Sequence, residues 1–169
     1  IPQFDYIRKS VEAFNLPSIE LINYEADDLI ATYSEQIIKK GGDVTIVSSD
    51  KDLMQLYKKN IRIYDPMKNK FINEEDIQKK FGVKAEKVID VQSLAGDSSD
   101  NVPGVPGIGI KTAAELINEY GTLENLLSNS KNIKQNKRRE TLIENKQKAM
   151  ISKKLVTLKK DVPVKVPYS

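Results

Sequence analysis

Hydrophobic residues follow two kinds of spacing along this chain. Residues 4–14 and 25–40 carry apolar side chains at helical intervals, and two glycines at 41–42 end the second pattern. Another short helix is expected at about 51–57. Short apolar runs predict buried strands, which are expected at 19–22, 44–47 and 61–64. Strands and helices that alternate over short connections predict an α/β layer with a mainly parallel sheet.

Beyond Asn73 the strand pattern nearly disappears and helical spacing takes over. Helices are expected near 74–81, 85–95, 110–120, 122–128 and 136–158, and an extended segment near 162–166. The chain therefore divides into two predicted parts. Residues 1–80 form an α/β part, and residues 81–169 form a helical subdomain.

The composition limits the chemistry that the chain can perform. Its 169 residues include no cysteine and no histidine. Disulfides, thiolate chemistry, histidine acid–base catalysis and the common zinc sites are therefore excluded. Any bound metal is expected to be a hard cation held by carboxylates, such as Mg²⁺ or Mn²⁺. No apolar run approaches the roughly 18 residues of a membrane span, so we expect no membrane partner.

Charge is unevenly distributed within a net charge of +3. Residues 1–100 hold 14 basic and 18 acidic residues, whereas residues 101–169 hold 13 basic and 6 acidic ones. An acidic half suits cations and a basic half suits polyanions. Charges spread over solvated helix faces would give the same counts, so the motifs must decide between the two interpretations.

Seven carboxylates occupy loop, strand-end or helix-start positions: Glu25, Asp27, Asp28, Asp50, Asp52, Asp97 and Asp100. The first three open a predicted helix, where they could simply complement its dipole. The next two directly follow a predicted strand, at the end where open α/β sheets place ligands, although the first of them could equally cap a helix. The last two lie in a turn-rich loop that is uninformative by itself.

Convergence of these acids would have a chemical consequence. Like charges a few ångströms apart cannot all stay ionised without cations. Two divalent ions roughly 4 Å apart would remove the repulsion and support phosphodiester hydrolysis, because one activates a water and the other stabilises the leaving oxygen. Such a site needs no histidine. Neither the haloacid-dehalogenase pattern nor the EF-hand loop fits the sequence.

Residues 102–114 are rich in glycine and precede a predicted helix. Free backbone N–H groups at such a turn suit a phosphate. A Walker loop would need Lys at Ile110, and the dinucleotide-binding pattern would need Gly at Thr112. A helix–hairpin–helix that binds the DNA backbone fits better, and a purely structural turn is the alternative. The expected DNA contacts are Gly104, Gly107, Ile108, Gly109, Lys111 and Thr112.

Three blocks of residues carry a family resemblance. They are Tyr24–Asp28, Ser49–Leu53 and Gly96–Ala113, the last running from an acidic loop into the glycine hairpin. In order and spacing they resemble the 5′-nuclease superfamily, most closely the 5′–3′ exonuclease domain of bacterial DNA polymerase I. The similarity extends over nearly the whole chain.

This resemblance implies a PIN-like nuclease core and a helical subdomain with a helix–hairpin–helix (helix-3-turn-helix) motif. It implies an acidic rim that binds two Mg²⁺ or Mn²⁺ ions and a K⁺ ion held by hairpin carbonyls. By motif position, one metal is expected near the acids at positions 25, 27 and 28. The other is expected among those at 50, 52, 97 and 100.

The activity implied is that of a metal-dependent 5′–3′ exonuclease and flap endonuclease. Its partners would be duplex DNA with a 5′ flap or nick and the RNA primer–DNA junction, in primer removal and excision repair. A monomer in the bacterial cytoplasm, at the nucleoid, is expected. Family members begin with a metal-binding aspartate, basic residues and a helical arch, and we expect this chain to start after them and to cleave DNA poorly alone.

Two other classes of function remain open. One is a non-catalytic helix–hairpin–helix DNA-binding module whose carboxylates are structural. The other is a small-molecule phosphohydrolase, which would leave the hairpin and the basic second half unexplained.

Overall fold

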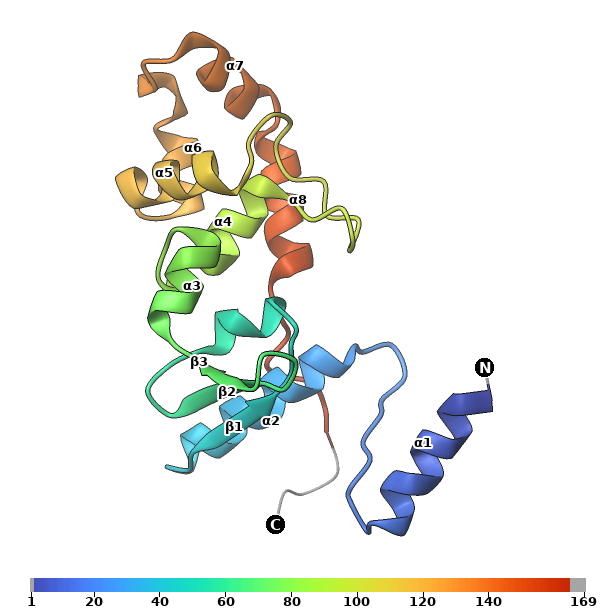
Figure 1. Ribbon diagram of the computed structural model, residues 1–169. Coiled ribbons are helices and arrows are strands. Elements are labelled where there is room, and N and C mark those ends of the chain that lie inside the picture. Colours follow the sequence, from blue (N-terminus) through green and yellow to red (C-terminus); the bar gives the residue numbers. More distant parts are fainter. Residues whose placement is uncertain (1, 165–169) are drawn as a thin grey trace.

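A computed structural model of the protein describes residues 2–164, with a small sheet at one end and a stack of helices at the other (Figure 1). The three strands are β1 (Val44–Val47), β2 (Ile61–Asp65) and β3 (Lys70–Ile72). They lie in the order β1-β2-β3. The first pair is parallel, as expected, with Val44 opposite Ile61. The second pair is antiparallel, so the sheet is mixed, and β3 was not predicted because its three residues show no clear alternation.

The strand expected at 19–22 is wrong, because that segment pairs with no strand. Ile22 is 85% exposed, and an apolar run without a pairing partner has nothing to hold it extended. β1 does form, but only Ile46 of its residues is buried, since β1 lies at the edge of the sheet. Of the extended segment expected at 162–166, residues 162–164 are irregular, and 165–166 lie outside the described residues.

Residues 2–65 supply two α-helices and one 3₁₀ helix: α1 (Pro2–Ala13), α2 (Ala26–Lys39) and η1 (Asp52–Leu56). α1 matches the expected helix but lies apart from the rest of the molecule, with Phe4 and Ile7 more than half exposed (Figure 1). α2 packs against the sheet and buries Leu29 and Ala31. The short helix expected at 51–57 is the 3₁₀ helix.

The helical part contains six further α-helices and two further 3₁₀ turns among the described residues. They are α3 (Glu74–Phe81), η2 (Ala85–Lys87), α4 (Val88–Ala95), α5 (Ile110–Tyr120), α6 (Leu123–Ser128), η3 (Ser130–Asn132), α7 (Asn136–Glu144) and α8 (Lys146–Val156). α4 is central, because α5 and α8 both pack on it and Val88, Val91 and Leu94 are fully buried. None of the helices within residues 2–164 is long and apolar enough to cross a bilayer.

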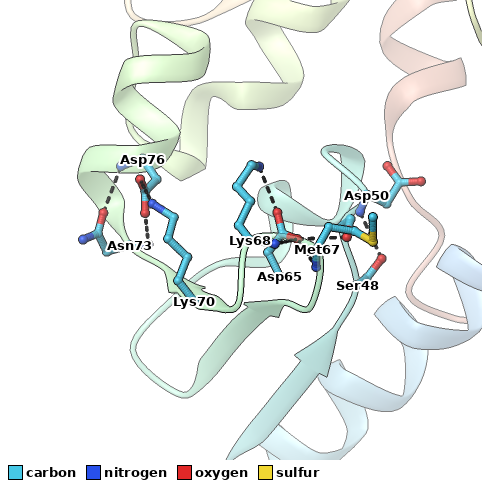
Figure 2. A network of polar contacts seen from close by, with 9 residues as sticks. Ser48, Asp50, Asp65, Met67, Lys68, Lys70, Asn73 and Asp76 are labelled. Atoms are coloured by element: carbon cyan, nitrogen blue, oxygen red, sulfur yellow. Dashed lines mark hydrogen bonds and ion pairs between the residues drawn. The ribbon is translucent and has the colours of Figure 1, made fainter.

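Local capping chemistry sets the bounds of α3. Asn73 accepts from the Asp76 N–H at 2.9 Å, and the Asp76 carboxylate accepts from the Asn73 N–H at 3.2 Å (Figure 2). This reciprocal arrangement satisfies two N–H groups that the helix start would leave unpaired. Gly82 ends the helix in the left-handed conformation at φ 72°, which a side chain would disfavour. The expected helix at 74–81 is therefore confirmed.

The single helix expected at 136–158 is wrong in one respect, because it is divided at Asn145. Asn145 has φ −105° and ψ 18°, ends α7 and begins α8. Its side-chain amide donates to the Thr141 carbonyl at 2.9 Å, and the same carbonyl accepts from the Asn145 backbone N–H at 3.0 Å. Asparagine competes for backbone groups in this way, which favours helix ends over helix interiors.

One continuous core joins the sheet to the helices. Ile63 of β2, Ile77 of α3, Leu94 of α4 and Ile117 of α5 belong to the same buried cluster. The loops at the end of β1 and the end of α4 are therefore held in a fixed relation by packed side chains.

Lys153 of α8 ties three helices together. Its Nζ lies 2.7 Å from an oxygen of Asp90 on α4 and 2.7 Å from an oxygen of Glu124 on α6. Asp90 is buried, so removing the cation would leave a buried carboxylate without its partner.

We predict that Lys153→Met lowers the free energy of unfolding by about 1–3 kcal/mol. The matched control is Lys154→Met, which removes the neighbouring exposed lysine. Urea unfolding followed by circular dichroism measures both variants. Equal stability of the two variants would contradict a structural role for the Lys153 bridge.

Candidate metal centre and hairpin

The turn after β1 presents the first acids of the site. The Ser48 N–H donates to the Tyr64 carbonyl at 3.0 Å, which extends the parallel ladder by one residue. The Asp50 N–H then donates to Ser48 Oγ at 3.1 Å, and the Asp52 N–H donates to Asp50 Oδ1 at 2.9 Å. These bonds fix the turn from the strand into η1, and with it the positions of both aspartates.

Asp65 anchors this turn from beneath. The side chain is almost fully buried and accepts from Ser49 Oγ at 2.9 Å, from the Met67 N–H at 3.0 Å and from Lys68 Nζ at 2.8 Å (Figure 2). The hydrogen bond from Lys68, with those from Ser49 and the Lys68 backbone, lowers the pKa of Asp65 to about 2. Asp65 was not singled out from the sequence, where it is one strand-end aspartate among several.

Three carboxylates from two separate segments meet beside that turn. Asp52 of η1 and Asp97 and Asp100 of the loop after α4 each offer an oxygen, and these oxygens lie within 4.8 Å of one another. Within residues 2–164 this is the only group of three acids so closely placed. All three were predicted as metal ligands, and the fold brings them together across more than forty residues of sequence.

The loop that carries two of these acids is closed on itself. The Asp97 N–H donates to the Val102 carbonyl at 2.9 Å, and the Val102 N–H donates back at 2.8 Å. Lys51 forms an ion pair with the Asp97 carboxylate. Burial raises the pKa of Asp97, but hydrogen bonds from Lys51 and Ser99 outweigh this effect and hold the pKa below its usual value.

The environment of Asp52 disfavours its ionised form. Burial raises its pKa, and the neighbouring Asp50 and Asp100 add to the rise. Gln92 of α4 opposes it, donating from Nε2 to Asp52 Oδ1 at 2.6 Å. The Gln92 side chain is buried, and its Oε1 has no hydrogen-bond partner among the described residues. Gln92 therefore orients Asp52, a role that the sequence pattern gave no reason to expect.

The start of α2 brings a further acid to the same rim. Burial raises the pKa of Asp27 to about 6, with smaller contributions from the charges of Asp50, Asp52, Glu25 and Asp28. These couplings place the acids of α2 and those of the turn after β1 on one side of the molecule.

The two remaining predicted ligands differ in their surroundings. Asp28 accepts from the Lys159 N–H at 2.8 Å, so one of its oxygens fastens the segment that follows α8. Glu25 is exposed and precedes α2 without a side-chain capping bond. Neither belongs to the close trio of Asp52, Asp97 and Asp100.

The donor set fits hard divalent cations. It consists of carboxylates alone, and Asp27 and Asp52 have raised pKa values, chiefly through burial and to a smaller extent through the neighbouring acids. A divalent ion among these oxygens would favour their charged forms. Lys51 does so in part through its ion pair with Asp97.

The glycine hairpin follows directly on the acidic loop. Gly104 and Gly107 have φ values of 58° and 75°. A side chain at Gly104 would meet the Gly96 nitrogen at 2.5 Å, so this glycine allows the hairpin to pack on the end of α4. The Gly104 N–H also donates to Ser152 Oγ of α8 at 2.9 Å. Gly104 is thus part of the interior, although it was named as a DNA contact.

The other predicted contacts divide into buried and exposed positions. Ile108 is buried, and Thr112 is half-buried. Gly107, Gly109 and Lys111 are exposed, and a Cβ at either glycine would meet nothing within 4 Å. Gly109 precedes α5 without a side-chain cap, so the first N–H groups of that helix receive no capping side chain.

Comparison with known proteins agrees with both parts of this architecture. A family model described as the N-terminal resolvase-like domain of 5′–3′ exonucleases matches residues 1–82, and one described as their C-terminal SAM fold matches residues 83–169. The chain thus has the two-part architecture of a nuclease, a resolvase-like domain followed by a SAM fold. It belongs to the 5′–3′ exonuclease family.

Curated relatives include polymerases and free-standing nucleases. DNA polymerase I of Rhizobium leguminosarum is 57% identical over 164 residues, covering 97% of this chain and 16% of the polymerase. The 5′–3′ exonuclease of Aquifex aeolicus is 38% identical, covering 97% of this chain and 55% of the exonuclease. The chain therefore spans only part of the relatives that it matches.

Solved structures share the fold. The T5 5′-exonuclease with bound zinc ions superposes with a TM-score of 0.81 at 24% identity, covering 90% of this chain and 58% of that one. The catalytic core of Rad2 in complex with DNA substrate gives a TM-score of 0.54 at 27% identity, covering 92% of this chain and 48% of that one.

We predict that Asp65→Asn makes the protein less stable at neutral pH and that this difference shrinks in acid. The folded pKa of about 2 lies below the ordinary value of 3.8, so the carboxylate stabilises the fold above about pH 4 and loses that effect as the pH falls toward 2. Urea unfolding of both proteins at several pH values measures the difference. The control is Asp5→Asn on the exposed α1. A pH-independent difference for Asp65→Asn would be inconsistent with this anchor.

Proposed function

We propose that this chain is the metal-binding and duplex-gripping portion of a 5′–3′ exonuclease and structure-specific flap endonuclease. The observation that carries the proposal is the meeting of Asp52, Asp97 and Asp100 oxygens within 4.8 Å, in a chain with no histidine or cysteine. Membership of the 5′–3′ exonuclease family supports the same activity. The polymerase relatives suggest that the parent protein is a DNA polymerase I.

The acids are assigned to two ions, Mg²⁺ or Mn²⁺. The first ion is held among Asp50, Asp52, Asp97 and Asp100, and the second near Glu25, Asp27 and Asp28. Two such ions, when bound, supply an activated water and stabilise the leaving oxygen of a phosphodiester.

Two neighbouring side chains would prepare the first site. Gln92 holds the orientation of Asp52 through its 2.6 Å hydrogen bond. Lys51 lies against Asp97 and would be displaced toward solvent, or toward the phosphate, as a metal enters.

The hairpin is assigned to the phosphate backbone of a duplex, without sequence readout. Gly104, Gly107, Ile108, Gly109, Lys111 and Thr112 form or support this contact. Carbonyl groups of the same hairpin would hold a K⁺ ion. Duplexes with a 5′ flap or nick and RNA primer–DNA junctions are the proposed substrates.

The proposed setting follows from this activity. Residues 1–80 would form the end of the nuclease core and residues 81–169 the DNA-binding subdomain. The protein would act as a monomer on the bacterial chromosome, in the cytoplasm, in primer removal and excision repair.

We predict that the chain binds two Mg²⁺ or Mn²⁺ ions and that Asp52→Asn and Asp100→Asn each weaken binding of one of them by at least tenfold. Loss of a ligand charge from a shared site gives this result. Calorimetric titration measures stoichiometry and affinity. Glu119→Gln, which removes an exposed acid from α5, is the control. Unchanged metal binding in both aspartate variants would contradict the proposed centre.

A second candidate is a non-catalytic DNA-binding module. The observation in its favour is the ion pair between Lys51 and Asp97, by which the fold itself already neutralises one of the acids. Duplex binding without any measurable metal binding would support the module over the nuclease.

We predict that Lys111→Ala weakens duplex binding by a similar factor for every sequence. An exposed lysine beside the hairpin contacts phosphate rather than base, so the loss carries no sequence preference and lowers the salt dependence of log K by about 1. Fluorescence anisotropy with two unrelated duplexes at several salt concentrations measures both effects. A loss confined to one of the duplexes would rule out backbone contact.

A further inference from the structure

A second basic surface lies beside the hairpin. The loop before α5 lies near α7 (Figure 1). Side chains from both segments line a groove of about 250 Å³. Residues of the hairpin and of α5 line one wall, and residues at the start of α7 line the other: Pro106, Gly107, Ile108, Thr112, Gln135, Lys137, Arg138 and Thr141. The α7 wall was not among the predicted DNA contacts.

The chemistry of this groove suits an anion. Its lining contains two cationic side chains, two hydroxyls and an amide, and no carboxylate. Its volume is below the roughly 300–1,000 Å³ of pockets that enclose whole small molecules. A group that projects from a larger ligand, such as one phosphate of a strand, therefore fits better than a free metabolite.

The two cations of the α7 wall are available for a ligand. Lys137 is exposed, and its side chain makes no hydrogen bond or ion pair within the described residues. Arg138 lies 3.9 Å from Glu115, whose side chain is 55% exposed. The Arg138 side chain is half-buried, but its ion pair with Glu115 is long and partly solvated. The pair therefore contributes little, and Arg138 can turn to a phosphate at small cost.

The neighbouring Arg139 has a different role. Its guanidinium donates to the Ile133 carbonyl at 3.0 Å and to Asn136 Oδ1 at 2.7 Å. These bonds fasten the loop before α7 to the start of the helix. Leu142, on the same helix, is fully buried. α7 is therefore anchored at its start and packed through Leu142, which holds Lys137 and Arg138 beside the hairpin.

We propose that Lys137 and Arg138 form the second half of a phosphate clamp, which closes on a DNA strand held by the hairpin. Exposed Gly107 leaves the hairpin side open to the strand, and the arginine fork can bind phosphate oxygens in pairs. The inference rests on the proposed function, because it requires that the hairpin binds a nucleic acid backbone. It adds α7 to the duplex-binding surface.

The test is duplex binding by the double variant Lys137→Gln/Arg138→Gln. Affinity at moderate salt is expected to fall about tenfold, and the slope of log K against log salt to decrease by roughly 1–2, as two phosphate contacts are lost. Fluorescence anisotropy at several salt concentrations measures both. Thermal unfolding should change little, because Lys137 is exposed and the ion pair between Arg138 and Glu115 is long.

A matched control removes the same charge elsewhere. Lys39→Gln/Lys59→Gln takes two exposed lysines from the sheet end of the molecule, far from α7 (Figure 1). Its salt slope is expected to remain at the wild-type value.

The outcomes separate this inference from the function on which it rests. If the wild type binds no duplex, the proposed function itself fails. If Lys111→Ala weakens binding but the α7 double variant behaves like the lysine control, only the clamp is overturned. Inorganic phosphate should compete no better than chloride at equal ionic strength. Stronger competition would indicate a site for free anions and would also overturn the clamp.

Discussion

Burial of carboxylates beside one another is the constraint on which the rest of this structure depends. Burial of Asp27 and Asp52 raises the pKa of both, with smaller contributions from neighbouring acids such as Asp50, so part of the folding free energy is spent on holding these charged groups in place. Completely buried side chains such as Leu53 of η1 and Leu94 of α4 belong to the packed core that holds the segments bearing the acids. The protein gives up stability at this rim to keep the acids close together.

Sequence reasoning succeeded where local chemistry decides the structure. The expected bounds of α3 agree with the structure, in which the capping pair Asn73 and Asp76 and the terminal Gly82 are local signals. The expected bounds of α5 agree as well, with Gly109 before it and Gly121 after it. The three acids of the close trio were identified because each lies in a block whose order along the chain is typical of one family.

The features that the sequence analysis predicted wrongly or missed depend on partners that are distant in sequence. The apolar run at 19–22 forms no strand, since a strand needs a neighbour that no local pattern can supply. Gln92 hydrogen-bonds to Asp52, forty residues before it, and Asp65 accepts a hydrogen bond from Ser49 in the turn after β1. Neither residue stands out in the sequence by its type or its spacing. Gly104, which stays a predicted DNA contact, also packs against the end of α4, a structural role that its place in a glycine-rich stretch did not reveal.

The acidic loop and the hairpin are one continuous segment between α4 and α5. The bridge between Asp97 and Val102 closes the first half, and Gly104, pressed against Gly96, begins the second. No flexible linker separates the two halves. In the proposed function, the spacing between them sets the distance along the DNA strand from the phosphate bound at the hairpin to the bond that is cut. An insertion between Val102 and Gly104 is therefore expected to shift the position of cleavage.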